Sequence, residues 1–403
     1  MTINNKHNKL NFSNEREQSQ ACLNSAEHEK NQGRKVLNVP NLRFPEFQGE
    51  WEKCKLSEIC TFFSGGTPSS SNKDFYGGNI AFIRSGELHA DSTELFITQA
   101  GFDSSSAKMV EVGDLLLAMY GATSGDIAVS KIKGAINQAI LCIRTKQDKK
   151  FIESVWNKHV SKNLRKYLQG GQGNLSADIV KGISFFFPTL KEQEKIANLV
   201  SLLDERISTQ NKIIEDLKKL KSAISENLFK AVKGDVVILY EICEIIKGKQ
   251  INGEFLSEKG KYYVMNGGTE PSGYYSDYNV EANTISISEG GNSCGYVQFN
   301  SSPFWSGGHC YTIQKIADNV DNLYLYHYLK SHEDVIMKLR IGSGLPNIQK
   351  KDLAMFKIKL PTVEQQKSIS TFLSSLERKA EIEEMLLNAM KKEKQYLLRQ
   401  MFI

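Results

Sequence analysis

Glycine-rich loops with polar neighbours are the parts of this sequence whose residue types suit chemistry. They occur as SGGT at 64–67, YGATS at 120–124, GGQGN at 170–174, EGGNS at 289–293 and SGLPN at 343–347. Glycines let a backbone approach a phosphate closely, and Asn, Gln, Glu, Lys or Arg side chains beside them can hydrogen-bond to base edges. The same loops can equally serve as surface turns, so their surroundings have to decide between the two uses.

Motifs of the common nucleic-acid enzymes are absent from the sequence. The segments GKQ at 248–250 and GKY at 260–262 lack the context of a phosphate-binding loop. GATSG at 121–125 resembles a Gly-x-Ser-x-Gly elbow only loosely, and Ser124 has no evident partner. All eight prolines are isolated, which rules out the Asp/Asn-Pro-Pro-Tyr motif of amino-methyltransferases, and the histidines show no metal-ligand spacing. We therefore expect neither a catalytic nor a metal site.

Composition predicts a cytoplasmic protein with more than one domain. The 403 residues exceed what one core usually holds, and no apolar run is long enough to span a membrane. Seven scattered cysteines without a C-x-x-C pair fit a reducing compartment. A net charge of +5 is compatible with a polyanionic partner. Residues 1–37 are polar, lack periodicity and an apolar signal-peptide core, and are predicted to form a flexible arm.

The sequence contains one long internal repeat. PTLKEQEKI at 188–196 returns as PTVEQQKSI at 361–369, and residues 170–229 moved forward by 173 positions match 343–402 at twelve of sixty positions. A period of this length indicates duplicated domains rather than a solenoid. The identical pairs are Gly171/Gly344, Asn174/Asn347, Pro188/Pro361, Thr189/Thr362, Gln193/Gln366, Ile196/Ile369, Ser201/Ser374, Leu203/Leu376, Lys218/Lys391, Lys219/Lys392, Lys221/Lys394 and Phe229/Phe402.

Weaker matches extend the repeat upstream. They pair KLSEIC at 55–60 with ILYEIC at 238–243, FIRSG at 82–86 with VMNGG at 264–268, LLLAMYGATSGDIAV at 115–129 with TISISEGGNSCGYVQF at 284–299, and NQAILCI at 137–143 with GHCYTI at 308–313. Short apolar runs bounded by Gly, Asn, Asp or Pro predict strands in both copies, with helical segments at 151–168 and 323–339 between them. We predict an α+β fold, two similar domains with mixed sheets and short helices arranged as an internal pseudo-two-fold repeat.

Each copy ends in a long amphipathic segment, 190–233 and 363–403. Neither segment contains an interior Pro or Gly, and its apolar residues recur at spacings of three and four, as in a coiled coil. We expect the two helices to form an antiparallel pair that separates the domains; the alternative is that each helix packs on its own domain. The residues expected to form the helix and subunit interfaces are Leu199, Leu203, Leu217, Ile224, Phe372, Leu376, Leu386 and Leu397.

A duplicated mixed domain, each copy followed by a long helix that opens with P-T-x-x-(E/Q)-Q-x-x-I, resembles the DNA-specificity subunit of Type I restriction–modification systems. NVPNLRFPEFQGEWEKCKLSEI at 38–59 also resembles the beginning of a first target-recognition domain in that family. The resemblance covers roughly residues 38–403. It implies two target-recognition domains, 38–189 and 234–362, each reading half of a bipartite site in double-stranded DNA.

The resemblance also implies a division of labour between chains. The helices at 190–233 and 363–403 would set the gap between the half-sites and dock methylation subunits. Modification and cleavage would belong to separate methylation and restriction subunits, which would use S-adenosylmethionine, ATP and Mg²⁺. This chain would itself bind no cofactor and would not be an enzyme.

Loops between short strands are where a rigid scaffold displays binding residues. The candidate DNA-binding residues of the first copy are Ser64, Gly65, Gly66, Thr67, Arg84, Tyr120, Thr123, Asn137, Gln138, Gln172 and Asn174. Those of the second copy are Lys249, Asn266, Gly267, Glu289, Asn292, His309, Ser343 and Asn347, with Lys247–Gln250 as the loop that carries the first of them.

Structural roles remain alternatives for several of these residues. Gly121 and Gly290, taken as corresponding positions, could simply form turns; Asn174 and Asn347 could stabilise turns; and His309 could be an interior histidine. For the whole chain, the alternatives are a coiled-coil scaffold without affinity for DNA and a stand-alone nucleic-acid-modifying enzyme with an unrecognised site.

Overall fold

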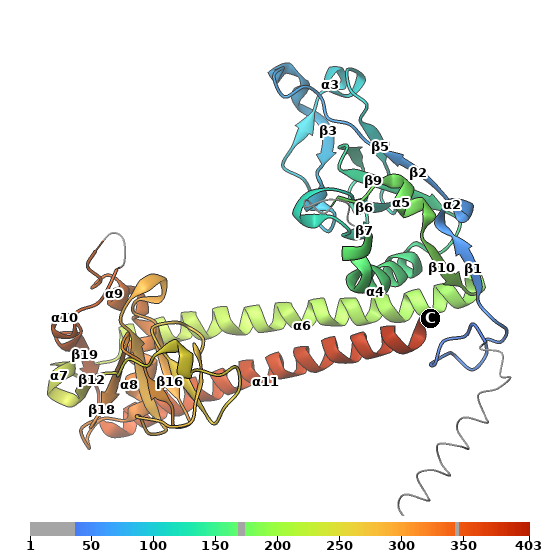
Figure 1. Ribbon diagram of the computed structural model, residues 1–403. Helices are drawn as coiled ribbons and strands as arrows, with labels where there is room; N and C mark the ends of the chain where they lie inside the picture. The colour runs from blue at the N-terminus through green and yellow to red at the C-terminus, as the bar shows by residue number, and fades with distance from the viewer. Residues whose placement is uncertain (1–36, 168–173, 343–345) are drawn as a thin grey trace, which may run out of the picture. The chain divides into compact units, whose positions relative to one another are not determined.

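The computed structural model describes residues 37–167, 174–342 and 346–403 (Figure 1). The predicted arm, residues 1–37, lies outside this range except for its last residue. The chain divides into two compact units: the first takes the chain up to Glu205 together with Lys392–Ile403, and the second is Arg206–Lys391. Two long helices, α6 (Leu190–Ala231) and α11 (Val363–Met401), contribute residues to both units.

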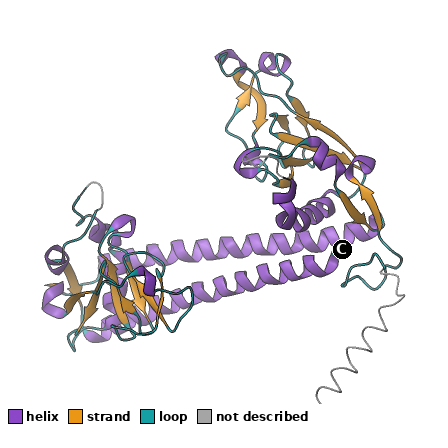
Figure 2. Cartoon of the chain, viewed as in Figure 1, coloured by secondary structure: helices purple, strands orange, loops and turns teal. Residues whose placement is uncertain are grey.

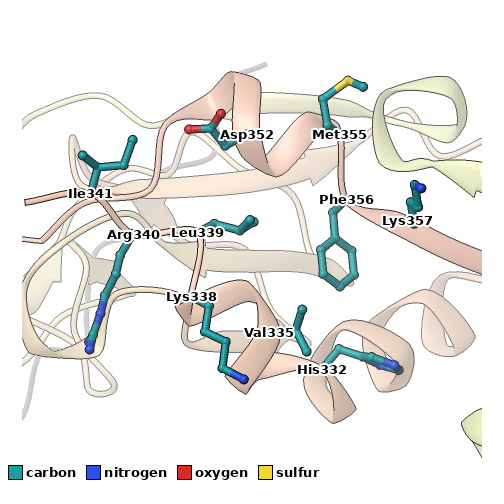
Figure 3. Close-up of a pocket in the computed structure, with 10 residues that line it drawn as sticks. All are labelled: His332, Val335, Lys338, Leu339, Arg340, Ile341, Asp352, Met355, Phe356 and Lys357. Carbon is teal, nitrogen blue, oxygen red and sulfur yellow. The ribbon is translucent and has the colours of Figure 1, made fainter.

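The first unit is built on a four-stranded antiparallel sheet of order β2-β9-β6-β7, with a second sheet of order β4-β3-β8-β5. Figure 2 shows the strands of both units in orange and the helices in purple. Its elements before α6 are β1 (Glu52–Lys55), α2 (Leu56–Ile59), β2 (Cys60–Ser64), η1 (Lys73–Phe75), β3 (Tyr76–Ile83), η2 (Ser85–Glu87), β4 (Phe96–Ile97), α3 (Gln99–Asp103), β5 (Lys108–Val110), β6 (Leu115–Ala118), η3 (Gly121–Thr123), β7 (Ile127–Val129), β8 (Gly134–Ile136), β9 (Ile140–Thr145), α4 (Lys149–Tyr167), α5 (Ala177–Gly182) and β10 (Ser184–Phe187).

The central strands of this sheet are buried on both faces. Because side chains alternate along a strand, Leu115 and Leu117 of β6 join the core under α4, which contains Phe151 and Trp156. The intervening Leu116 faces a separate apolar cluster. This two-sided burial explains why LLLA reads as a continuous apolar run rather than as an alternating pattern.

The second unit has a sheet of the same order, β12-β18-β15-β16, and a small sheet of order β14-β13-β17. Its elements are β11 (Asp235–Ile238), α7 (Leu239–Ile242), β12 (Glu244–Lys247), η4 (Gly253–Phe255), β13 (Tyr262–Met265), β14 (Gly273–Tyr275), β15 (Thr284–Ser288), η5 (Gly291–Ser293), β16 (Val297–Asn300), β17 (Trp305–Ser306), β18 (Cys310–Gln314), α8 (Asn322–Ser331), α9 (Glu333–Met337), α10 (Lys350–Ala354) and β19 (Lys357–Leu360).

Strand registers show that the two units are copies of one frame. In the first sheet Leu115 pairs with Ile143, and in the second Ile285 pairs with Ile313. The parallel contact of β3 with β8 likewise recurs as β13 with β17. The predicted α+β repeat is therefore confirmed. One detail differs, because the helix expected at 323–339 is interrupted at His332, which separates α8 from α9.

The two long helices run antiparallel where they meet. In the second unit Gln210 donates to Glu383, and Lys221 pairs with Glu377 further along α6. In the first unit Lys394 pairs with Asp204. No helix in the described ranges has the length and apolar character needed to cross a membrane.

At two of the predicted interface positions, the buried residue is not the predicted one but the next residue along the helix. Leu373 and Leu387 of α11 are buried, whereas Phe372 and Leu386 are exposed. On α6, Ile214 is buried while its neighbour Ile213 is exposed. Leu199, Leu203, Leu217, Ile224, Leu376 and Leu397 are partly buried. Since Ile213 and Leu386 occupy equivalent positions of the repeat, each helix leaves the same apolar position open.

Candidate nucleic-acid interface

The turn after the first sheet strand is held close to a neighbouring loop in both units. A Cβ atom on Gly65 would overlap the carbonyl oxygen of Ile136, and one on Gly248 would overlap that of Gly307. The following amide groups are tied to the same loops, since Gly66 N donates to Ile136 O at 3.2 Å and Lys249 N to Ser306 O at 2.8 Å. Only glycine fits this approach, which fixes the turns that carry Ser64–Thr67 and Lys247–Gln250.

A second pair of loops follows β3 and β13. The amide of Asn137 donates to Ile83 O, and in the second unit Gly307 N donates to Met265 O. These bonds bring the next residues, Arg84 and Asn266, to corresponding positions. The Arg84 guanidinium is half-exposed and pairs with Glu87 at 2.6 Å, which raises the pKa of Arg84 through the Glu87 hydrogen bond.

A third pair of loops follows β6 and β15. Met119 N donates to Ala139 O, and Glu289 N donates to His309 O at 2.9 Å. The 3₁₀ turns that come next require a positive φ at Gly121 (79°) and Gly291 (74°). Gly121 therefore corresponds to Gly291 rather than to Gly290, because the inserted residue of the second copy lies before the loop.

The fourth segment joins the same sheet end. Leu175 N donates to Met119 O at 2.9 Å, and Ile348 N donates to Glu289 O at 2.8 Å. The preceding residues, Asn174 and Asn347, are thereby carried next to the third loops, and Asn347 forms a backbone bridge with Gly290. Four loops thus converge on one end of the sheet in each unit. They carry most of the described candidates, and the others, Asn137, Gln138 and His309, lie in the adjoining β8–β9 and β17–β18 connections.

A family model for the Type I restriction modification DNA specificity domain matches residues 48–219 and, a second time, residues 232–392. The chain belongs to this family. A protein of Methanocaldococcus jannaschii, provisionally named as the type I restriction enzyme MjaX specificity subunit, is 25% identical over 407 residues, covering 86% of this chain and 92% of its own length. The type I restriction enzyme MjaVIII specificity subunit of the same organism is 23% identical over 386 residues, 85% of this chain and 88% of its own.

Solved structures show the same fold. The S subunit of the Type-I restriction-modification system from M. genitalium superposes with a TM-score of 0.65 at 19% identity, covering 91% of this chain and 99% of its own. A specificity subunit provides the DNA sequence preference of its complex and is not itself the catalyst, and it holds no cofactor. The missing enzyme motifs follow from this division.

Several candidates in the first specificity unit make local bonds. The Thr67 hydroxyl bonds the Gln138 side chain, and Asn137 Oδ1 accepts from Ala139 N at 3.1 Å. Arg84, Tyr120 and Gln138 remain exposed at the loop tips. Gln172 and Ser343 lie outside the described residues. Thr123 and Asn292 lie in the 3₁₀ turns but do not correspond, because Thr123 is the third residue of its turn and Asn292 the second.

The second unit concentrates charge where the first does not. Lys247 Nζ lies 2.6 Å from Glu289 Oε1, and the Tyr311 hydroxyl donates to the same oxygen at 3.0 Å. Burial and the Glu289 carboxylate raise the pKa of Tyr311, which keeps its hydroxyl protonated as a donor. His309, expected to be either a contact or an interior residue, has an exposed ring and a backbone amide that donates to Asn266 Oδ1. In the sequence, only the position of Lys247 at the start of the loop Lys247–Gln250 indicated that it could contact DNA.

Proposed function

We propose that each unit reads one half of a bipartite site in double-stranded DNA with the four loops at its sheet end. The observation that carries this proposal is the recurrence of the same loops, on the same frame, with different side chains. A duplicated frame supplies two equivalent docking geometries, and differing side chains supply different base preferences. Half-sites of unlike sequence follow from this arrangement.

The exposed side chains suit readout in the major groove. Arginine pairs with guanine O6 and N7, and Asn or Gln pairs with adenine N6 and N7. Arg84 and Gln138 offer these groups in the first unit. In the second, the partly buried Asn266 stands at the position of Arg84, and its Oδ1 accepts from His309 N. The close packing of Gly65 and Gly248 against neighbouring loops fixes the backbone of the turns from which Ser64–Thr67 and Lys247–Gln250 would meet the DNA.

Genome-wide methylation mapping of the source strain tests this proposal. We expect one bipartite methylated motif to vanish when the gene for this chain is removed and to return with the intact gene. The purified chain alone should transfer no methyl group from S-adenosylmethionine. A methylation pattern unchanged by the loss of the chain would overturn the proposal, and unaided methylation would favour the stand-alone enzyme.

We further propose that methylation subunits dock on the long helices and that restriction subunits join that complex in the cytoplasm, where the partners use S-adenosylmethionine, ATP and Mg²⁺. Ile213 and Leu386 support this idea, because these equivalent apolar side chains are 41% and 42% exposed on paired helices. One open apolar position repeated on each helix fits two equivalent docking sites, one for each copy of a partner. A structurally similar chain, with a TM-score of 0.55 at 18% identity over 86% of this chain and 96% of its own, comes from work on complex assembly of the type I R-M system.

A further inference from the structure

One ionic cluster in the second unit has no counterpart in the first. Glu289 is a buried carboxylate, 4% exposed, and one of its oxygens is paired with Lys247, whose side chain is 52% exposed. The other oxygen, Oε2, accepts no hydrogen bond from any described residue and lies 3.6 Å from His309 Nδ1. A buried carboxylate with a free oxygen is costly, so its presence needs an explanation.

The first unit shows that the fold does not require these charges. Strand registers and loop bonds place Ser64 at the position of Lys247 and Met119 at that of Glu289. Leu141 stands in the place of Tyr311, and Ala139 in that of His309. Met119 and Leu141 are buried and apolar, so the same frame closes here with apolar packing alone. The fold itself therefore does not need a charged cluster at this place.

We propose that Lys247 reads a guanine in the half-site of the second unit, and that Glu289 is the residue that positions it. This inference rests on the proposed function. Lysine carries three ammonium hydrogens, of which one is directed at Glu289 Oε1, leaving two for the O6 and N7 acceptors of guanine. The neighbouring glycine turn at Gly248 fixes the backbone of Lys247. The buried Glu289 carboxylate then restrains the flexible end of the Lys247 side chain through its bond to Nζ.

The position of the cluster supports base contact. Lys247 ends β12 at the sheet end where the four loops meet, and the exposed ring of His309 lies beside the carboxylate there. At the opposite end of the same strand, Glu244 pairs with Lys315 in an exposed ion pair. Two ion pairs thus bracket one strand, but only the pair at the loop end has a buried carboxylate.

Methylation mapping with the full-length chain in its assembled complex tests the inference. For Lys247→Met we expect the preference for guanine at one position of one half-site to fall about tenfold to a hundredfold, with the other half-site unchanged. Glu289→Gln should weaken the preference for guanine at the same position. Lys247→Arg should retain that preference, because arginine also pairs with guanine. The matched control is Glu244→Gln, which should alter neither half-site.

A double variant guards against misfolding. Lys247→Ser with Glu289→Met installs the residues that the first unit already uses at these positions, so it should fold and still lose the guanine preference. Unchanged preference at every position in the Lys247→Met and double variants would overturn the inference. A change with Glu289→Gln but none with Lys247→Met would also overturn it, because Glu289 would then read an amino-bearing base itself. Absence of any bipartite motif with the unaltered chain would instead overturn the proposed function.

Discussion

Phe402 and Phe229, which are 173 residues apart in the chain, fill the same place in the two units. The Phe402 ring lies 5.2 Å from that of Phe151, and the Phe229 ring lies 5.7 Å from that of Tyr324. Phe151 and Tyr324 are themselves related by the repeat. The residue that follows α11 therefore completes the core of the first unit, as the last turn of α6 completes that of the second.

Removal of the Phe402 ring should destabilise the first unit. Phe402→Ala leaves a cavity beside Trp51 and Phe151, and loss of a buried phenylalanine typically costs about 3–5 kcal/mol. Urea unfolding of the full chain followed by tryptophan fluorescence measures this, since Trp51 contacts the ring. Ile403→Ala, at an exposed neighbour, is the control and should shift unfolding little. Equal effects of the two variants would contradict the core role of Phe402.

The glutamine of the repeated helix opening has a structural task that explains its presence in both copies. Gln366 Nε2 donates to Pro361 O at 2.9 Å and to Asn319 O, and its Oε1 accepts from Asp321 N. Gln193 makes the corresponding bonds to Pro188 O and from Asp148 N. Each aspartate caps the helix that covers its sheet, α8 or α4.

Gln366→Ala should therefore lower the free energy of unfolding by about 1–3 kcal/mol, because buried backbone groups lose their partners. The adjacent Gln365 is exposed, so Gln365→Ala is a control that changes the same residue type without the buried bonds. Chemical denaturation of the two variants makes the comparison. If Gln365→Ala lowered the free energy of unfolding as much as Gln366→Ala, the buried hydrogen bonds of Gln366 would not be the cause of the effect.

Repetition made much of the fold predictable from the sequence. The apolar run at 115–118 and the alternating segment at 284–288 each indicate a strand, and their similar surroundings imply similar sheets. The strand order and the helix pairing agree with that expectation. Helix 151–168 was predictable because its apolar residues recur at helical spacing, whereas no local pattern marks the break at His332, whose ring lies beside those of Phe229 and Phe356.

Details set by tertiary contacts were not predictable. Neighbouring apolar residues such as Phe372 and Leu373 satisfy the helical spacing almost equally, so at Phe372 and Leu386 the buried residue is the next one along the helix. The candidate loops were found because glycine marks them, but the partners of Glu289 come from β12 and β18, far away in the sequence. The bonds of Gln193 and Gln366 to distant loops likewise leave no local pattern.

Arg84→Ala should relax one half-site and leave the other intact. The guanidinium is exposed at the tip of its loop, and a bidentate contact to guanine is worth about 1–3 kcal/mol of discrimination. Methylation mapping of the variant strain measures both halves at once. Lys133→Ala, which removes another exposed cation of the same unit, is the control. Equal loss in both half-sites would show that Arg84 supports the fold rather than reads a base.

Buried His327 should make stability depend on pH. Burial lowers the pKa of His327 from 6.5 to about 4. The nearby Lys221 lowers this pKa further, whereas the carboxylates of Glu377 and Asp321 raise it. The unfolded state therefore binds an extra proton between pH 6.5 and pH 4, and about 3 kcal/mol of stability present above pH 6.5 is lost across that range. His327→Gln should flatten the slope. Ser374→Ala removes the 2.8 Å hydrogen-bond partner but keeps the histidine, so it should retain the slope.

Ile213 and Leu386 should each serve one copy of a methylation subunit, because the repeat presents the same apolar position once on each helix. Replacing an exposed apolar side chain by glutamine removes interface area without opening a cavity, so Ile213→Gln or Leu386→Gln should leave unfolding nearly unchanged. We expect each single variant to bind fewer methylation subunits and the double variant to bind fewest, as measured by light scattering of the purified complex. Ile214→Gln, at the buried neighbour, should instead destabilise the chain by about 2–5 kcal/mol. Full subunit binding by the double variant would mean that the partners dock elsewhere.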